Sequence, residues 1–129
     1  MCWKFEISTG KLYDPQGNYV ATGYSGGGCG QDPDAVDNPD DVALKGIGPL
    51  PEGLYTLGQP VQQSKLGPFA IPLNPDPSNQ MYGRGDFFCH GDSIQHPGDA
   101  SEGCVIMPLT WRRAMWNSTD HQLQVVASV

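Results

Sequence analysis

The sequence predicts a mainly β domain with long loops and one short helix near the C-terminus. Short runs rich in Tyr, Phe, Val and Ile recur between clusters of Gly, Pro, Asn and Asp, which is typical of strands joined by turns. Helical periodicity is sustained only in PLTWRRAMWNS (108–118), where Trp111 and Met115 lie four residues apart. A chain of 129 residues is long enough for one hydrophobic core, so we expect a single domain over residues 1–129.

The expected strands begin with a β-meander, in which Gly17 and Asn18 supply a tight turn between alternating segments. Pro72 lacks the N–H that a central strand donates, so that end of the strand PFAIPL is expected at an edge of the sheet. The sequence predicts strands at WKFEI (3–7), KLYD (11–14), YVATGY (19–24), LYTL (54–57), PFAIPL (68–73), DFFCH (86–90) and QLQVVASV (122–129).

The longest expected loop, SGGGCGQDPDAVDNPDD (25–41), is rich first in glycine and then in aspartate. Its acidic residues lack the Asp-x-Asp-x-Asn/Asp-Gly order and the distal Glu of a calcium loop. The run from Gly26 to Gly28 lacks the strand-to-helix context of a phosphate-binding loop. Asn38 before Pro39 instead predicts one helical turn, because Asn caps helices and Pro suits the first helical position.

Charge and hydropathy exclude two classes of function. Seven Lys and Arg against fourteen Asp and Glu give a net charge of −7 without a basic block, so we expect no nucleic-acid partner. No run approaches the roughly 18 apolar residues of a membrane span. The start MCWKFEISTG lacks the basic and apolar regions of a Sec signal. We therefore expect the protein to be made in the bacterial cytoplasm without a Sec signal.

The stretch FFCHGDSIQHPGDASEGCVIMP (87–108) holds the candidate chemistry. His90 ends an apolar strand and precedes Gly91, so its imidazole can emerge from the sheet edge. Gly103 lets the backbone turn tightly before Cys104, so that the N–H groups of Gly103 and Cys104 can point at a substrate carbonyl. Because a cysteine nucleophile needs an adjacent base and such donors, the pattern indicates Cys104 as nucleophile and His90 as base.

Other roles remain open for these side chains. Cys104 precedes the apolar run 105–107 and could be a small buried side chain. A zinc site would need Cys89 and His90 together, but neighbouring strand residues point to opposite faces and no CxxC or HExxH pair exists, so no metal is expected. Cys89 is therefore expected in the core. Whether Cys2 and Cys29 form a disulfide stays open.

His90-Gly91 followed by Ser101-x-Gly103-Cys104 resembles the signature of the L,D-transpeptidase (YkuD-type) catalytic domain. GPLPEGLYTLG (48–58), the strand into HGDS, and SEGCVIMP are similar to the DUF2778 branch of that group, which includes the Tlde1-type effectors of type VI secretion. The resemblance runs from about Tyr13 to the C-terminal strand. It implies an L,D-transpeptidase-like β-sandwich or open barrel.

The resemblance also implies roles for individual residues. It places the nucleophile at Cys104 and the general base at His90, with Gly91, Ser101 and Gly103 in support. Asp92, Ser101 or a backbone carbonyl is expected to orient His90. A substrate carboxylate is expected at Arg84, Arg112 or Arg113, and the cleft walls are expected at Tyr24, Ser25, Tyr82 and His96.

Two positions depart from the common transpeptidase motif. Glu102 stands where that motif has a histidine, and Ile106 stands where it has an arginine. Both changes are compatible with the DUF2778 branch.

The implied activity is that of an L,D-transpeptidase or L,D-carboxypeptidase, which cleaves or exchanges the diamino acid–D-Ala bond of peptidoglycan stems through a thioacyl-enzyme and without a cofactor. Such an enzyme would act in the periplasm or cell wall after delivery, with a secretion apparatus or an immunity protein as partner. One alternative is an NlpC/P60-like cysteine peptidase, although those place Cys before His along the chain. The other is a non-catalytic phage or secretion-system module in which Cys104 is part of the core.

Overall fold

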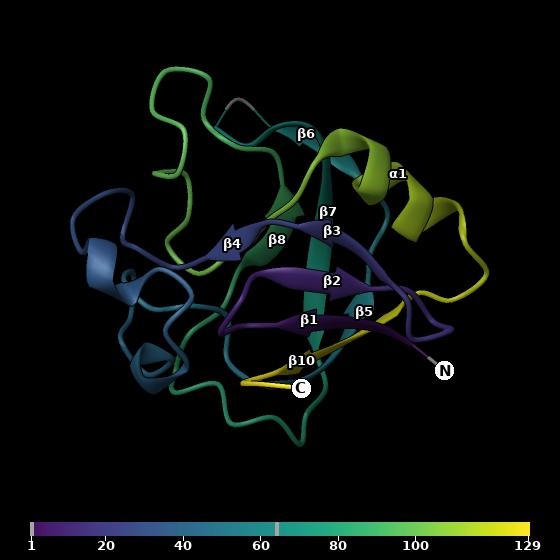
Figure 1. Ribbon diagram of the computed structural model, residues 1–129, viewed down its shortest axis with the longest axis horizontal. Coiled ribbons are helices and arrows are strands. Elements are labelled where there is room, and N and C mark those ends of the chain that lie inside the picture. Colours follow the sequence, from purple (N-terminus) through teal and green to yellow (C-terminus); the bar gives the residue numbers. More distant parts are fainter. Residues whose placement is uncertain (1, 64) are drawn as a thin grey trace.

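The computed structural model describes residues 2–63 and 65–129 and confirms the mainly β fold. Strands account for 32% of the chain against 12% for helix, so the sheet defines the architecture. The sheet curls into a nearly closed, barrel-like shape, and one helix, α1 (Leu109–Asn117), packs on its outside (Figure 1).

The path of the sheet runs β3-β2-β1-β10-β5-β7-β8-β9-β4, with β6 paired to β7 beside it. Most pairs are antiparallel, whereas β1 with β10 and β8 with β9 are parallel. The strands are β1 (Trp3–Glu6), β2 (Lys11–Tyr13), β3 (Tyr19–Thr22), β4 (Tyr24–Ser25), β5 (Gly53–Leu57), β6 (Val61–Gln63), β7 (Gly67–Pro75), β8 (Phe87–His90), β9 (Val105–Ile106) and β10 (Gln122–Val126).

A single residue brings the two ends of the sheet together. β3 and β4 lie at opposite ends of the strand order, yet only Gly23 separates them in sequence. A side chain at Gly23 would collide with the carbonyl oxygen of Ile106 in β9. Glycine therefore allows the chain to pass close to β9 as it crosses from one end of the sheet to the other.

Apolar side chains on alternate positions of the strands fill the interior of the barrel. The parallel register sets Trp3 opposite Leu123 and Phe5 opposite Val125, and all four side chains are buried. Because side chains of paired residues point to the same face, these strands present one apolar face to the interior. Tyr55, Ile71, Leu73, Phe87, Cys89, Val105, Met107 and Met115 belong to the same core.

The local predictions are largely confirmed. Helix α1 falls within the predicted range 108–118, and a short 3-10 turn at Pro39–Asp41 (η2) follows another at Pro33–Ala35 (η1). The Asn38 side chain caps η2 by accepting a hydrogen bond from the Asp40 N–H, 3.1 Å away. Helix α1 and η2 were expected from the helical repeat and from Asn38 and Pro39, whereas η1 was not predicted.

The prediction that the Pro72 end of its strand lies at an edge of the sheet is wrong. β7 lies between β5 and β8, and Pro72 is opposite Phe88 of β8. On the other side of β7, pairing with β6 ends at Ala70 and pairing with β5 begins at Leu73. Pro72 is tolerated because it falls where β7 changes partners, so the missing N–H interrupts neither ladder.

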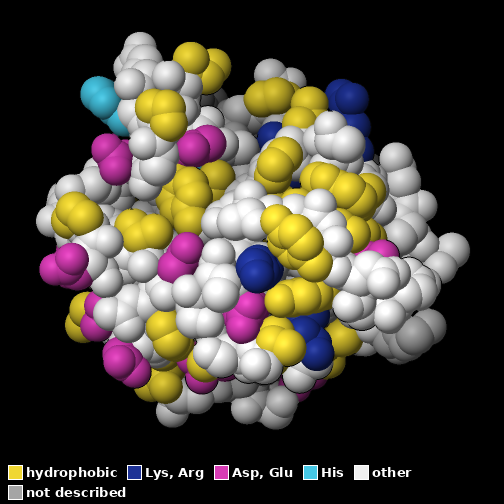
Figure 2. All heavy atoms as spheres, viewed as in Figure 1, with side chains coloured by type: hydrophobic (Ala, Val, Ile, Leu, Met, Phe, Trp, Pro, Cys, Tyr) yellow, Lys and Arg dark blue, Asp and Glu magenta, His cyan; other side chains and the backbone are white. Residues whose placement is uncertain are grey.

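On the face drawn in Figure 2, acidic side chains lie mainly over the half of the molecule that carries η1 and η2 in Figure 1, while basic side chains lie nearer the centre and the opposite half. Within residues 2–63 and 65–129, no helix is both long and apolar enough to cross a bilayer.

Candidate active site

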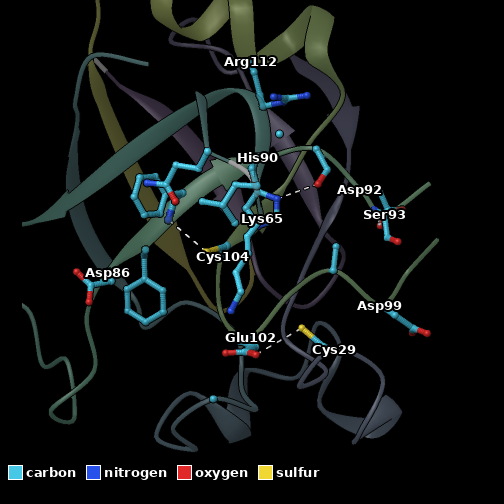
Figure 3. Close-up of a pocket in the computed structure, with 18 of the residues that line it drawn as sticks. Cys29, Lys65, Asp86, His90, Asp92, Ser93, Asp99, Glu102, Cys104 and Arg112 are labelled. Carbon is cyan, nitrogen blue, oxygen red and sulfur yellow. Dashed lines mark hydrogen bonds between the residues drawn. The ribbon is translucent and has the colours of Figure 1, made fainter. Parts of the chain in front are cut away.

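The candidate base ends β8 and the candidate nucleophile directly precedes β9, the strand that pairs with β8 in parallel. β8 and β9 pair with Cys89 opposite Val105 and His90 opposite Ile106. Cys89 and Val105 are almost completely buried in the core, as expected for Cys89. Because side chains alternate along a strand, His90 and Cys104 both point to the other face, where they line the same groove (Figure 3).

The groove has a volume of about 1190 Å³ and is lined by residues from separate parts of the chain. They are Cys29 of the glycine-rich loop, Lys45 and Gly46, Gln63 with residues 65–68, residues between Arg84 and Cys104, and Arg112 of α1. Its charged lining residues are mixed in sign: Lys45, Lys65, Arg84, Arg112, Asp86, Asp92, Asp99 and Glu102. The groove can therefore accommodate a substrate that carries both charges.

Burial governs the protonation state of Cys104. It raises the pKa of the thiol to about 11. The Phe88 N–H donates a hydrogen bond to Sγ over 3.3 Å, which favours the thiolate, while the nearby Glu102 carboxylate disfavours it. Burial outweighs the hydrogen bond, so Cys104 is a neutral thiol at neutral pH.

His90 is held as a neutral base with a fixed tautomer. The imidazole is only 3% exposed, and burial lowers its pKa, an effect that the nearby Arg112 cation reinforces. Nδ1 lies 2.8 Å from the carbonyl oxygen of Gly91. Since a carbonyl can only accept, Nδ1 carries the proton, and the lone pair of Nε2 is left to accept another.

The group that orients His90 is therefore a backbone carbonyl, which was one of the three expected possibilities. Asp92 does not fill that role. Its carboxylate accepts hydrogen bonds from the Tyr24 hydroxyl and from the N–H groups of Ser93 and Gly98. Asp92 thus ties the loop after β8 to β4, and it acts on His90 only through its charge.

The loop before Cys104 is organised around the buried hydroxyl of Ser101. Ser101 Oγ accepts from the N–H groups of Gly26, at 2.8 Å, and Gly103, at 3.0 Å, and donates to the Cys104 carbonyl oxygen, at 2.6 Å. Gly103 is therefore not the oxyanion donor that the sequence suggested, because its N–H is already bonded. The Cys104 N–H has no acceptor among the described residues and remains the backbone donor beside the thiol.

Gly103 instead allows close packing. Its φ of +135° lies in a region that L-residues rarely adopt, and a Cβ there would lie 2.5 Å from Arg84 Nη2 and 2.6 Å from the Phe87 ring. The glycine thus admits Arg84 and Phe87 behind the Cys104 turn.

Arg84 is committed to the protein's own backbone. The guanidinium donates to the carbonyl oxygens of Val42, Pro49, Gly48 and Glu102 at distances between 2.5 and 3.1 Å. These bonds occupy all four N–H groups of Nη1 and Nη2. Arg84 therefore joins the 42–49 loop to the Cys104 turn, and it has no N–H group of Nη1 or Nη2 left for the substrate carboxylate expected there.

The residues predicted to form the cleft walls lie outside the lining of the groove. Ser25 is fully buried, where it accepts from the Leu50 N–H and donates to the Gly103 carbonyl. Tyr24 lines a smaller neighbouring hollow and bonds Asp92 and the Ala100 N–H through its hydroxyl. Tyr82, 46% exposed, and His96, also exposed, lie outside the lining of the groove.

The structure adds Cys29 to the groove. Cys29 Sγ donates to Glu102 Oε1 over 3.6 Å, and both residues line the groove near Cys104. All four cysteines are free thiols, so Cys2 and Cys29 do not form a disulfide. Nothing in the local sequence could have indicated the position of Cys29, because it depends on how the glycine-rich loop returns to Ser101.

Within the described part of the chain, no three His, Cys, Asp or Glu side chains gather as metal ligands. A family model described as the Tlde1 domain matches residues 20–129 of the chain. No curated protein and no solved structure shows significant similarity to this chain.

Proposed function

Because the chain belongs to the Tlde1 domain family, a family of type VI secretion effectors, we propose that it is an antibacterial enzyme that acts on the stem peptides of peptidoglycan. The proposed reaction is cleavage or exchange at the bond between the diamino acid and D-Ala, with Cys104 as nucleophile. The observation that carries the proposal is the placement of Cys104 and His90 on one face of β8 and β9, in one groove, with Nδ1 of His90 fixed by the Gly91 carbonyl.

The protonation states suggest how the first step proceeds. Since the thiol and the imidazole are both neutral at rest, the Cys104 proton moves to His90 Nε2 as Sγ attacks the carbonyl carbon of the diamino acid. The new C–S bond turns the carbonyl oxygen into an oxyanion. The donor proposed for it is the Cys104 N–H, which has no acceptor among the described residues.

The second step breaks the C–N bond. His90 returns its proton to the departing amine, D-Ala leaves, and the acyl group stays on Sγ as a thioester. Water then attacks the thioester to give a carboxypeptidase, or an amine attacks to give exchange or transpeptidation. In either case His90 accepts the proton of the attacking group and Cys104 regains its thiol.

This reaction places the protein's action in the periplasm or cell wall of a target cell, where stem peptides are exposed, after delivery by a type VI apparatus. An immunity protein in the producing cell would block the reaction most directly by covering the groove.

The test is incubation of purified tetrapeptide muropeptides with the wild-type protein and with Cys104→Ala, followed by mass spectrometry. We expect loss or exchange of one D-Ala with the wild type and none with the variant. Cys2→Ala is the matched control, because Cys2 is a free thiol outside the groove, and it should retain full activity. Unchanged muropeptides with the wild type, or equal product with Cys104→Ala, would refute the proposed function.

A further inference from the structure

Arg112 has a guanidinium that is fixed on one side and free on the other. The side chain is 5% exposed although it lies on α1 at the surface of the sheet. Nε donates to the Met107 carbonyl oxygen at 3.0 Å, and Nη1 donates to the carbonyl oxygens of Pro68 and Phe69 at 2.9 Å each. Nη2 has no hydrogen-bond partner among the described residues.

The free nitrogen faces the candidate active site. Within the described residues, every fully buried side-chain nitrogen or oxygen has a partner, so the unpaired Nη2 must be accessible to solvent. Arg112 lines both the main groove and a neighbouring hollow of about 410 Å³, and Gly91 and Asp92 also line both. A Cβ at Gly91 would lie 2.8 Å from Nη2, so the glycine keeps the space in front of this nitrogen open.

The positive charge of Arg112 is not neutralised within the protein. Its hydrogen bonds go to carbonyl oxygens, and the nearest acid on the loop, Asp92, bonds Tyr24, Ser93 and Gly98 instead. A largely buried guanidinium with one free N–H group binds anions such as carboxylates favourably, because the charge is already desolvated and held in place. Nη2 of Arg112 can thus donate a hydrogen bond to an anionic group of a ligand.

The position of Arg112 relative to His90 indicates which anion. In Figure 3, Arg112 lies on the side of His90 away from Cys104. In the proposed reaction the acyl group is bonded to Cys104, and His90 protonates the leaving amine. The α-carboxylate of the leaving residue is attached to the same carbon as that amine, so it extends past His90 toward Gly91 and Nη2.

We infer that Arg112 Nη2 binds the free α-carboxylate of the D-amino acid that departs, so that the substrate class is stem peptides whose last bond is the scissile one. This inference rests on the proposed function. Stems with a further residue beyond the scissile bond, or with an amidated C-terminus, lack a carboxylate at this position and bind more weakly.

The experiment measures binding in the Cys104→Ala protein, where peptides stay intact. Isothermal titration calorimetry compares a stem tetrapeptide that ends in D-Ala with the same peptide as its C-terminal amide. We expect the acid to bind about tenfold more tightly or better, which is typical of one charged hydrogen bond. The peptide pair tests the inference without any change to the fold.

Two further variants in the Cys104→Ala background assign this preference to Nη2. Arg112→Gln should abolish the preference for the acid, but it also removes bonds to three carbonyls and requires a check of folding by circular dichroism. Gly91→Ala blocks the space before Nη2 and leaves those bonds in place, so it should reduce the preference in a folded protein. Arg113→Gln is the matched control, because Arg113 is exposed on the same helix and does not line the groove.

The outcomes separate the inference from the proposed function. Equal affinity for acid and amide, no measurable binding of either, or a preference that survives both Arg112→Gln and Gly91→Ala would overturn the role of Arg112. A preference that depends on Arg112, found together with a wild-type protein that leaves the tetrapeptide intact, would support the carboxylate site and refute the cleavage reaction.

Discussion

The backbone N–H of Phe88 donates a hydrogen bond to Sγ of Cys104, 3.3 Å away, across the start of the β8–β9 pair. The proposed nucleophile is thus joined to the strand that ends in its proposed base. This contact stabilises negative charge on sulfur, yet burial keeps the proton on the thiol. A neutral Cys104 beside a neutral His90 makes the predicted pH dependence different from that of a preformed thiolate–imidazolium pair.

The reactivity of Cys104 toward iodoacetamide should report its raised pKa. Because only the thiolate reacts and the pKa is about 11, the alkylation rate of Cys104 in the folded protein should rise about tenfold per pH unit from pH 7 to 10. The same thiol in the urea-unfolded chain is the control and should level off near its ordinary pKa of 9.0. Peptide mass spectrometry resolves the four cysteines, and a folded-state plateau below pH 9 would contradict the prediction.

The pH profile of kcat/KM should show an acid limb set by His90. A base must be neutral, so activity is lost as pH falls through the pKa of His90. Since burial and the Arg112 charge lower this pKa from 6.5, the limb should lie below pH 6.5. In Arg112→Gln the limb should move to higher pH, because the Asp92 charge and the Gly91 carbonyl then act on His90 without the opposing cation. A limb that stays in place would show that Arg112 does not act on His90.

Arg84 should be a major contributor to stability. Arg84→Met leaves the carbonyls of Val42, Gly48, Pro49 and Glu102 without their donor, so we expect the free energy of unfolding in urea to fall by at least about 3 kcal/mol. The exposed Arg113 gives the matched control. Arg113→Met should change the free energy of unfolding by less than about 0.5 kcal/mol. Similar small losses in both variants would argue against a structural role for Arg84.

Asp37 should make the protein less stable as pH rises from about 4 to 6. Burial raises the pKa of its carboxyl from 3.8 to about 6, so the folded chain holds this proton more tightly than the unfolded chain. The stabilisation is complete below the unfolded pKa and is lost as pH rises through the folded one.

Asp37→Asn should remove this dependence and raise the stability at pH 7 by about 1 kcal/mol, a figure reduced for partial exposure. Asn can still accept from the Ser25 N–H, at 3.0 Å in the wild type, and it tolerates the positive φ of 54° at this position. Urea unfolding of both proteins at pH 4 and pH 7 is the measurement. Parallel pH dependence in the two would assign the titration to another group.

The parts of the site that the sequence predicted depend on local pattern. Strand alternation separates His90 from Cys89, and the resemblance links His90 to Cys104, so this pair could be placed in advance. The functions of Ser25 and Arg84 could not, because each bonds backbone groups from loops that are distant in sequence. Arg112 was one of several candidate cations, and only the packing of α1 against the chain around Pro68 shows which of its nitrogens is free.

The first two strands lie outside the residues that match the Tlde1 family, yet they lie inside the sheet. β1 and β2 stand between β3 and β10 in the strand order. A chain trimmed to residues 20–129 would leave β3 without β2 and would bare one edge of β10 (Gln122–Val126), where unpaired N–H and C=O groups favour aggregation. We therefore expect the folding unit to extend beyond the residues that match the family, and a soluble protein to require the residues that precede the match.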